Sequence, residues 1–164
     1  MSSPYLIPAH EIRREHVQVN SRFIASLAPV FSTDEARAFI KRIRQEFPDA
    51  SHNVPTYIIG GGNNLTEYCS DDGEPPGTAG RPALAVLRGS GLGDVAVVIT
   101  RYFGGTLLGT GGLVKAYTES AQLVVRDVPR ARKMRVHIAK LALPYILLSK
   151  LIKIIYQVGF GSCS

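Results

Sequence analysis

Residues 94–125 read DVAVVITRYFGGTLLGTGGLVKAYTESAQLVV, a run that passes from β-branched residues through glycines to a helical repeat. Residues 94–103 are apolar and too short for most helices, so they predict a strand buried on both faces. The glycine-rich residues 104–112 follow, and Val114 starts an apolar helical repeat with Thr110 as its expected N-cap. The run therefore predicts a strand, a glycine loop and a helix in that order.

A glycine loop between a strand and a helix is a common way to bind an anion. Bare N–H groups and the positive end of the helix face the space above the loop, and Lys115 is expected in the first helical turn. Lys115 follows Gly112 by three residues, which does not fit a P-loop, and Val114 replaces the third glycine of a dinucleotide motif. The loop either binds phosphate or backbone groups, or only turns sharply, and Gly111 is expected at positive φ.

The length of 164 residues suits one domain with its own core, or one domain and part of another. The two cysteines, Cys69 and Cys163, lie too far apart for a metal motif or a disulfide framework. The N-terminus lacks a basic segment followed by an apolar one, so no signal peptide is expected. These features favour a reducing, cytoplasmic location.

The net charge of +6 is unevenly distributed. Residues 1–128 contain 12 basic and all 13 acidic residues, a net charge of −1, whereas residues 129–164 carry +7. A basic tail favours an anionic partner such as nucleic acid, although such tails are also ordinary solvated surface. The residues that would contact nucleic acid lie at the start of the tail: Arg130, Arg132, Lys133 and Arg135.

The remaining patterns complete an α+β fold. Residues 17–27 alternate as a half-buried strand with Arg22 facing outward, and Ser32 opens a capping box before a helix that ends at Pro48. Residues 52–59 predict a strand, with Pro55 favouring a sheet edge, and a glycine turn leads into residues 65–69. Residues 82–88 predict a second helix. The order implies a mixed sheet with helices packed on it.

The stretch SDDGEPPGTAG, residues 70–80, places three carboxylates within a few positions. Asp71, Asp72 and Glu74 could bind a hard cation, with His52 joining them in space. The spacing does not match a calcium loop, and Pro75 and Pro76 favour a turn whose acids cap the following backbone. No metal and no cofactor are therefore expected. A hydrolase would need a nucleophile with its base or a fuller ligand set, and neither is visible.

Together, residues 70–82 and the stretch RYFGGTLLGTGGLVKAY, residues 101–117, closely resemble the YigZ and IMPACT N-terminal family. The likeness extends over about residues 5–128. It implies an α+β domain similar to the second domain of a small-subunit ribosomal protein and to a domain of elongation factor G. It also implies a link to translation, because the eukaryotic relative restrains a starvation-sensing translation kinase by competing for its activator.

The resemblance carries the candidate site onto particular residues. The expected ligand-binding residues are Arg22, His52, Arg101, Gly104, Gly105, Gly109, Gly111, Gly112 and Lys115. The acidic loop could grip a polar ligand opposite these basic groups. Alternatively, its carboxylates neutralise Arg101 and Lys115 within the fold, which we favour for part of the set because an unpartnered buried charge is costly.

The resemblance implies that a small ferredoxin-like domain follows in bacterial members, and the chain departs from that pattern in residues 129–164. These residues are expected to form a basic linker and an incomplete ferredoxin-like domain, with only its first strand over residues 136–143 and its first helix over residues 145–158. The expected helix has a wide apolar face, yet two lysines interrupt it, so it does not predict a membrane span. Such a face would favour self-association, contact with the body or a lipid surface.

Two function classes follow from these observations. The first is a non-catalytic translation- or stress-associated module that binds RNA, the ribosome or a translation regulator through the glycine loop and the tail. The second is a protein-interaction module in stress signalling without nucleic-acid contact. A hydrolase that uses the acidic loop is a distant third.

Overall fold

The computed structural model describes residues 4–62, 64–136 and 140–158. Their helices and strands are, in chain order, β1 Tyr5–Pro8, β2 Ile12–Gln18, β3 Ser21–Pro29, α1 Thr33–Glu46, β4 His52–Gly61, β5 Asn64–Cys69, α2 Gly80–Ser90, β6 Val95–Tyr102, α3 Gly109–Asp127, β7 Arg130–Lys133, the 3₁₀ turn η1 Tyr145–Leu147 and α4 Leu148–Val158.

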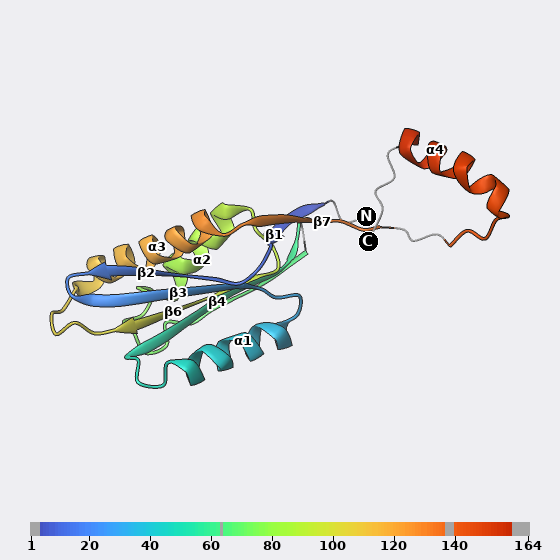
Figure 1. Ribbon diagram of the computed structural model, residues 1–164. Coiled ribbons are helices and arrows are strands. Elements are labelled where there is room, and N and C mark those ends of the chain that lie inside the picture. The colour runs from blue at the N-terminus through green and yellow to red at the C-terminus, as the bar shows by residue number, and fades with distance from the viewer. Residues whose placement is uncertain (1–3, 63, 137–139, 159–164) are drawn as a thin grey trace.

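A five-stranded sheet in the order β2-β3-β6-β4-β5 forms the middle layer of the fold. Helix α1 covers one face, and α2 and α3 cover the other (Figure 1). The α+β class is confirmed. The expectation of a mixed sheet is wrong, because all four strand pairings in this sheet are antiparallel.

Strand β6 lies at the centre because its side chains are apolar on both faces. Val95, Val97 and Ile99 pack with α2 and α3, and Ala96 and Val98 pack with α1. All five are completely buried, as the sequence predicts for a strand covered on both sides.

The helix boundaries follow the expected signals at α1 and α2. Ser32 caps α1 by accepting a hydrogen bond from the Glu35 N–H at 3.1 Å, and the Glu35 carboxylate accepts from the Phe31 N–H at 2.8 Å. Pro82 lies in the first turn of α2, which ends before Gly91 in the left-handed region at φ 71°.

The strand expected over residues 17–27 is instead a hairpin. Val19 and Asn20 have φ values of 45° and 63°, and this turn divides β2 from β3. Val17 and Val19 extend the apolar alternation of β3 backwards through the turn. Both side chains are exposed, so this part of the pattern does not mark a buried strand face. The position expected for Pro55 is also wrong, since β4 lies between β6 and β5.

Pro55 is tolerated inside the sheet because its backbone nitrogen and carbonyl face the side of β4 on which β5 lies. Its carbonyl accepts from the Ser70 N–H at 3.2 Å, so its nitrogen faces the same side, where β5 has already ended at Cys69. No ladder hydrogen bond is lost at that position.

Strand β7 pairs with β1 at the opposite end of the sheet from the loop that joins β6 to α3 (Figure 1). Residues 130–133, expected in a linker, therefore form a strand. In the strand expected over residues 136–143, residues 137–139 lie outside the described residues, and the flanking ones are not in a strand. The helix expected over residues 145–158 is confirmed as η1 and α4. Among the described helices, none has the length and apolarity needed to span a membrane.

Candidate functional site

The row of β6 side chains under α2 and α3 ends in a charge. Val95, Val97 and Ile99 are followed on the same face by Arg101, which is 5% exposed. Arg101 is directly opposite Phe23 of β3 and His52 of β4. A guanidinium buried at this position needs a partner, because an unpaired buried charge is strongly destabilising.

Glu74 supplies that partner from the loop between β5 and α2. The Arg101 Nη1 group donates to both carboxylate oxygens, at 2.7 Å to Oε1 and 3.0 Å to Oε2. The Tyr117 hydroxyl of α3 donates to Oε1 at 2.7 Å. Burial, together with this hydrogen bond, raises the pKa of Tyr117, so the phenol remains protonated and a donor. The prediction that acidic residues neutralise basic ones within the fold is confirmed for Arg101.

The rest of the Arg101 guanidinium is less completely bonded. Its Nη2 group lies 3.4 Å from the Ser21 hydroxyl, and its buried Nε has no hydrogen-bond partner among the described residues. The rings of Phe23 and Phe103 lie 5.6 and 5.7 Å from its carbon Cζ. Arg101 is therefore held by one carboxylate and two aromatic rings, with donor capacity to spare.

His52, which is half-buried, lies beside the pair of Arg101 and Glu74. Its Nδ1 lies 2.8 Å from the Asp72 carbonyl oxygen, so this nitrogen must carry a proton and donate. Its Nε2 lies 3.7 Å from the Glu74 Oε2 atom, which is too long for a hydrogen bond. The cluster thus brings together His52, Glu74 and Arg101 from three separated parts of the chain.

The two aspartates of the acidic loop hold backbone groups. Asp71 accepts from the N–H groups of Gly77, Ala79 and Gly80 at 2.8–3.1 Å. Burial disfavours its ionised form, but these three donors outweigh burial and lower the pKa of Asp71. Asp72 accepts from the Asn53 N–H at 2.7 Å and from Arg44 at 2.6 Å. The predicted capping role of this loop is confirmed.

A cleft of about 460 Å³ opens above the cluster, between the acidic loop and the start of α3. Glu74, His52 and Arg101 contribute its charged and titratable side chains. The other lining residues are mostly apolar or glycine: Gly73, Pro75, Phe103, Leu107, Leu108, Gly109, Thr110 and Leu113. A concave, largely apolar site with a few polar groups at its floor is typical of a binding site.

The Impact N-terminal domain matches residues 19–125 of this chain. The IMPACT family member YigZ of Escherichia coli is 44% identical over 130 residues, which cover 79% of this chain and 64% of that protein. An IMPACT family member of Haemophilus influenzae is 40% identical over 142 residues, or 86% of this chain and 69% of that protein. The chain belongs to the IMPACT family.

A solved crystal structure of a hypothetical protein has the same fold as this IMPACT-family chain. It superposes with a TM-score of 0.79 at 36% identity and covers 96% of this chain and 77% of that one. The aligned part spans 64% of the length of YigZ.

The structure collects some of the expected IMPACT-family ligand residues and separates others. His52, Arg101 and Gly109 line the cleft. Arg22 and Lys115 do not. The Arg22 side chain pairs with Glu15 at 2.9 Å and lies over the Tyr102 ring, and Lys115 Nζ lies 3.9 Å from Glu119. The expected pairing of Lys115 with the acidic loop is therefore wrong.

The glycine loop also differs in detail from the expectation. Because α3 begins at Gly109, Lys115 lies in its second turn, Thr110 lies inside the helix, and Leu108 occupies the N-cap position without a capping side chain. Gly105 and Gly109 have positive φ values of 83° and 71°, whereas Gly111 does not. Gly104 is required for a different reason: a Cβ there would lie 2.1 Å from the Asn20 carbonyl carbon. Gly112 lies within α3, where an added Cβ would approach the Leu108 Cβ to 3.1 Å.

The four basic residues expected to contact nucleic acid from the tail have different environments. Lys133 donates to Asp94 at 2.5 Å, and Arg130 lies 3.4 Å from the Ser90 carbonyl. Arg132 and Arg135 are exposed. Lys133 is therefore a structural counter-charge. Strand β7, which contains Arg130, Arg132 and Lys133, lies at the opposite end of the sheet from the loop that joins β6 to α3 (Figure 1).

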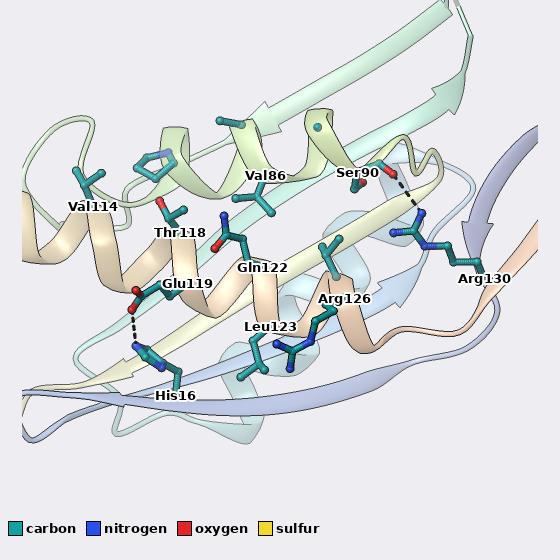
Figure 2. Close-up of a pocket in the computed structure, with 14 residues that line it drawn as sticks. His16, Val86, Ser90, Val114, Thr118, Glu119, Gln122, Leu123, Arg126 and Arg130 are labelled. Carbon is teal, nitrogen blue, oxygen red and sulfur yellow. Dashed lines mark hydrogen bonds and ion pairs between the residues drawn. The ribbon is translucent and has the colours of Figure 1, made fainter.

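A second hollow of about 1090 Å³ runs along the outside of α2 and α3. Figure 2 shows its mixed lining, with His16 of β2 facing Glu119 at 3.2 Å and Arg130 reaching Ser90 at one end. It is broad and open, and none of the nine expected ligand-binding residues lines it. We therefore take the cleft above Glu74 as the candidate site.

Sequence reasoning missed the apolar walls of the cleft. The sequence pattern predicts Phe103 in a strand buried on both faces and Leu107 in the glycine-rich loop, yet both side chains line the cleft and are exposed. Large apolar residues inside a glycine loop were the available signal. Within the described residues, no group of three or more His, Cys, Asp and Glu side chains is arranged to hold a metal ion.

Proposed function

We propose that this chain is a translation- or stress-associated binding protein of the IMPACT type that contacts RNA or the ribosome. The match of the Impact N-terminal domain to residues 19–125 carries the proposal. The family resemblance implies a link to translation through its eukaryotic members. A protein-interaction module in stress signalling, without nucleic-acid contact, is the alternative that the experiment below separates.

The charges of the cleft support binding rather than a reaction. Asp71 is occupied by backbone N–H groups and Asp72 by the Asn53 N–H and Arg44, and Glu74 is bonded to Arg101 and Tyr117. A carboxylate that acts as a general base or metal ligand needs a free oxygen aimed at a substrate or ion. Of the three acids, Glu74 is the one that lines the cleft, and its Oε2 atom accepts from Arg101 alone, at 3.0 Å.

Exposed cations beside the cleft could meet a phosphate backbone. The side chains of Arg22 and Lys115 are 52% and 65% exposed, and each pairs with an exposed glutamate. Such surface pairs contribute little stability, so either cation can exchange its glutamate for a phosphate at small cost. The proposal places the nucleic-acid contact at this end of the molecule and gives the tail a smaller role.

Co-sedimentation with purified ribosomes at several salt concentrations tests the proposal. The affinity should fall by roughly 0.7–0.9 log units per log unit of salt for each phosphate contacted. Replacing both Arg22 and Lys115 by alanine should reduce that slope by roughly 1.5. The matched control replaces Arg37 and Lys41, two exposed cations of α1 on the other face of the sheet. Ribosome binding that is insensitive to salt and to both double variants would favour the protein-interaction alternative.

A further inference from the structure

We propose that the cleft above Glu74 binds one unpaired nucleobase that carries an exocyclic amino group. The inference rests on the proposed RNA contact and names the chemical group that would enter the protein. It starts from two hydrogen-bond acceptors that face each other at the floor of the cleft.

The first acceptor is His52 Nε2. Because Nδ1 lies 2.8 Å from the Asp72 carbonyl oxygen, an acceptor without a proton, the neutral ring carries its proton on Nδ1 and leaves Nε2 as an acceptor. The second is Glu74 Oε2, 3.7 Å away. Two acceptors cannot bond to each other, so the group that satisfies them from the cleft is a donor.

The charges around the floor favour a neutral donor over an ammonium ion. Arg101 already neutralises Glu74 through bonds of 2.7 and 3.0 Å, and the start of α3, with its positive end, lines the same cleft. A full positive charge placed there would be repelled from both sides. An N–H₂ group attached to a ring or a carbonyl donates without that cost.

The apolar wall of the cleft favours a ligand whose amino group is attached to a flat aromatic ring. Phe103 is 49% exposed, and the Arg101 guanidinium lies 5.7 Å from its ring. Leu107 and Leu113 continue the apolar surface. Stacking of a base on an exposed aromatic ring is a common mode of single-strand recognition. A side-chain amide would supply the donor but leave this surface uncovered, so the base fits better.

Titration of the ¹⁵N-labelled chain with nucleosides tests the inference. The probes are adenosine and purine riboside, which differ only in the amino group. Adenosine should shift the amide signals of Gly73, Gly109 and Thr110, and purine riboside should bind at least about tenfold more weakly, because it leaves both acceptors unsatisfied. Tighter binding of single-stranded hexa-adenylate than of adenosine would assign the base to an RNA strand, and equal binding to a free nucleoside.

Two variants connect the signal to the cleft. Phe103→Leu removes the ring from a half-exposed position and should weaken adenosine binding about tenfold. The control is Tyr68→Leu, which removes a similarly exposed ring stacked on Tyr57, away from the cleft, and should change nothing. His52→Phe removes one of the two acceptors and leaves Glu74 Oε2, so it should reduce the preference for adenosine over purine riboside without abolishing it.

Equal binding of the two nucleosides, or no binding of either at millimolar concentration, would overturn the inference. So would tighter binding of an acetylated glutamine amide, which would assign the cleft to a peptide side chain. Ribosome co-sedimentation is measured without nucleosides, so a negative titration leaves that result standing. Loss of ribosome binding alone would likewise count against the proposed function and leave the nucleobase cleft supported.

Discussion

Two buried carboxylates, one at each end of β6, have similar partners and different surroundings. Glu74 at the cleft is 6% exposed and bonds to Arg101 and the Tyr117 hydroxyl. Asp94 at the opposite end is 1% exposed and bonds to Lys133 and the Tyr5 hydroxyl. Each is thus a carboxylate joined to one cation and one tyrosine.

The difference lies in what remains unsatisfied. Asp94 accepts additionally from the Gly60 N–H at 2.7 Å, and its three donors fasten β1, β4 and β7 to the start of β6. Glu74 lines the cleft and its Oε2 atom has a single donor, whereas the Nε atom of its partner Arg101 has no hydrogen-bond partner among the described residues. The same set of chemical groups therefore stabilises strands where it is saturated and forms a candidate binding site where it is not.

The largest expected effect is the contrast between Glu74→Gln and Asp94→Asn. Glu74→Gln leaves the Arg101 guanidinium buried without a counter-charge, so it should lower the free energy of unfolding by about 3–5 kcal/mol. Asp94→Asn should cost about 1–3 kcal/mol, because the Lys133 side chain is 42% exposed and can be hydrated. Asparagine also tolerates the positive φ of 48° at this position. Urea unfolding of both variants gives the values, and equal losses would contradict the comparison.

A smaller effect is expected from shortening the chain at the end where β1 pairs with β7. A chain that ends at Val128 loses β7 and the Lys133 partner of Asp94, so it should be less stable by about 2 kcal/mol. The matched control ends at Met134 and keeps both. Thermal unfolding compares the two, and a Val128 chain as stable as the Met134 chain would show that β7 contributes nothing to the body.

The smallest effect concerns pH. Burial disfavours ionisation of Asp94, but Lys133, Tyr5 and Gly60 outweigh it and lower the pKa of Asp94. Its contribution is therefore present above the unfolded pKa of about 3.9 and is lost as the pH falls through the lower folded value. The hydrogen bond to Asp94 raises the pKa of Lys133, so that contribution is present below about pH 10.4 and is lost as the pH rises through the higher folded value.

The difference in unfolding free energy between the native chain and Asp94→Asn should consequently be constant between about pH 5 and 9. It should shrink at both extremes, and urea unfolding across the pH range measures it. A difference that grows below about pH 4 would mean that the carboxylate is not held ionised by its donors.

Periodicity and capping residues predicted the elements whose neighbours along the chain determine them. The run from Val95 to Ile99, the Ser32 cap of α1 and the Pro82 start of α2 all follow local rules. The turn at Val19 and Asn20 was not predicted, because Val17 and Val19 continue the apolar alternation of a buried strand face although both are exposed. The interior position of Pro55 in the sheet was not predicted, because it depends on where the neighbouring strand β5 ends.

By itself, the sequence determined the family, the α+β class and the presence of a charge at the end of a buried strand, because motif order and apolar spacing are properties of the chain. Only the tertiary structure decided which charges are free. Arg101 and Glu74 are 27 residues apart, and Asp94 and Lys133 are 39 residues apart. Contacts over such separations are formed by strand pairing and helix packing, which brought His52 to the cleft and left Lys115 outside it.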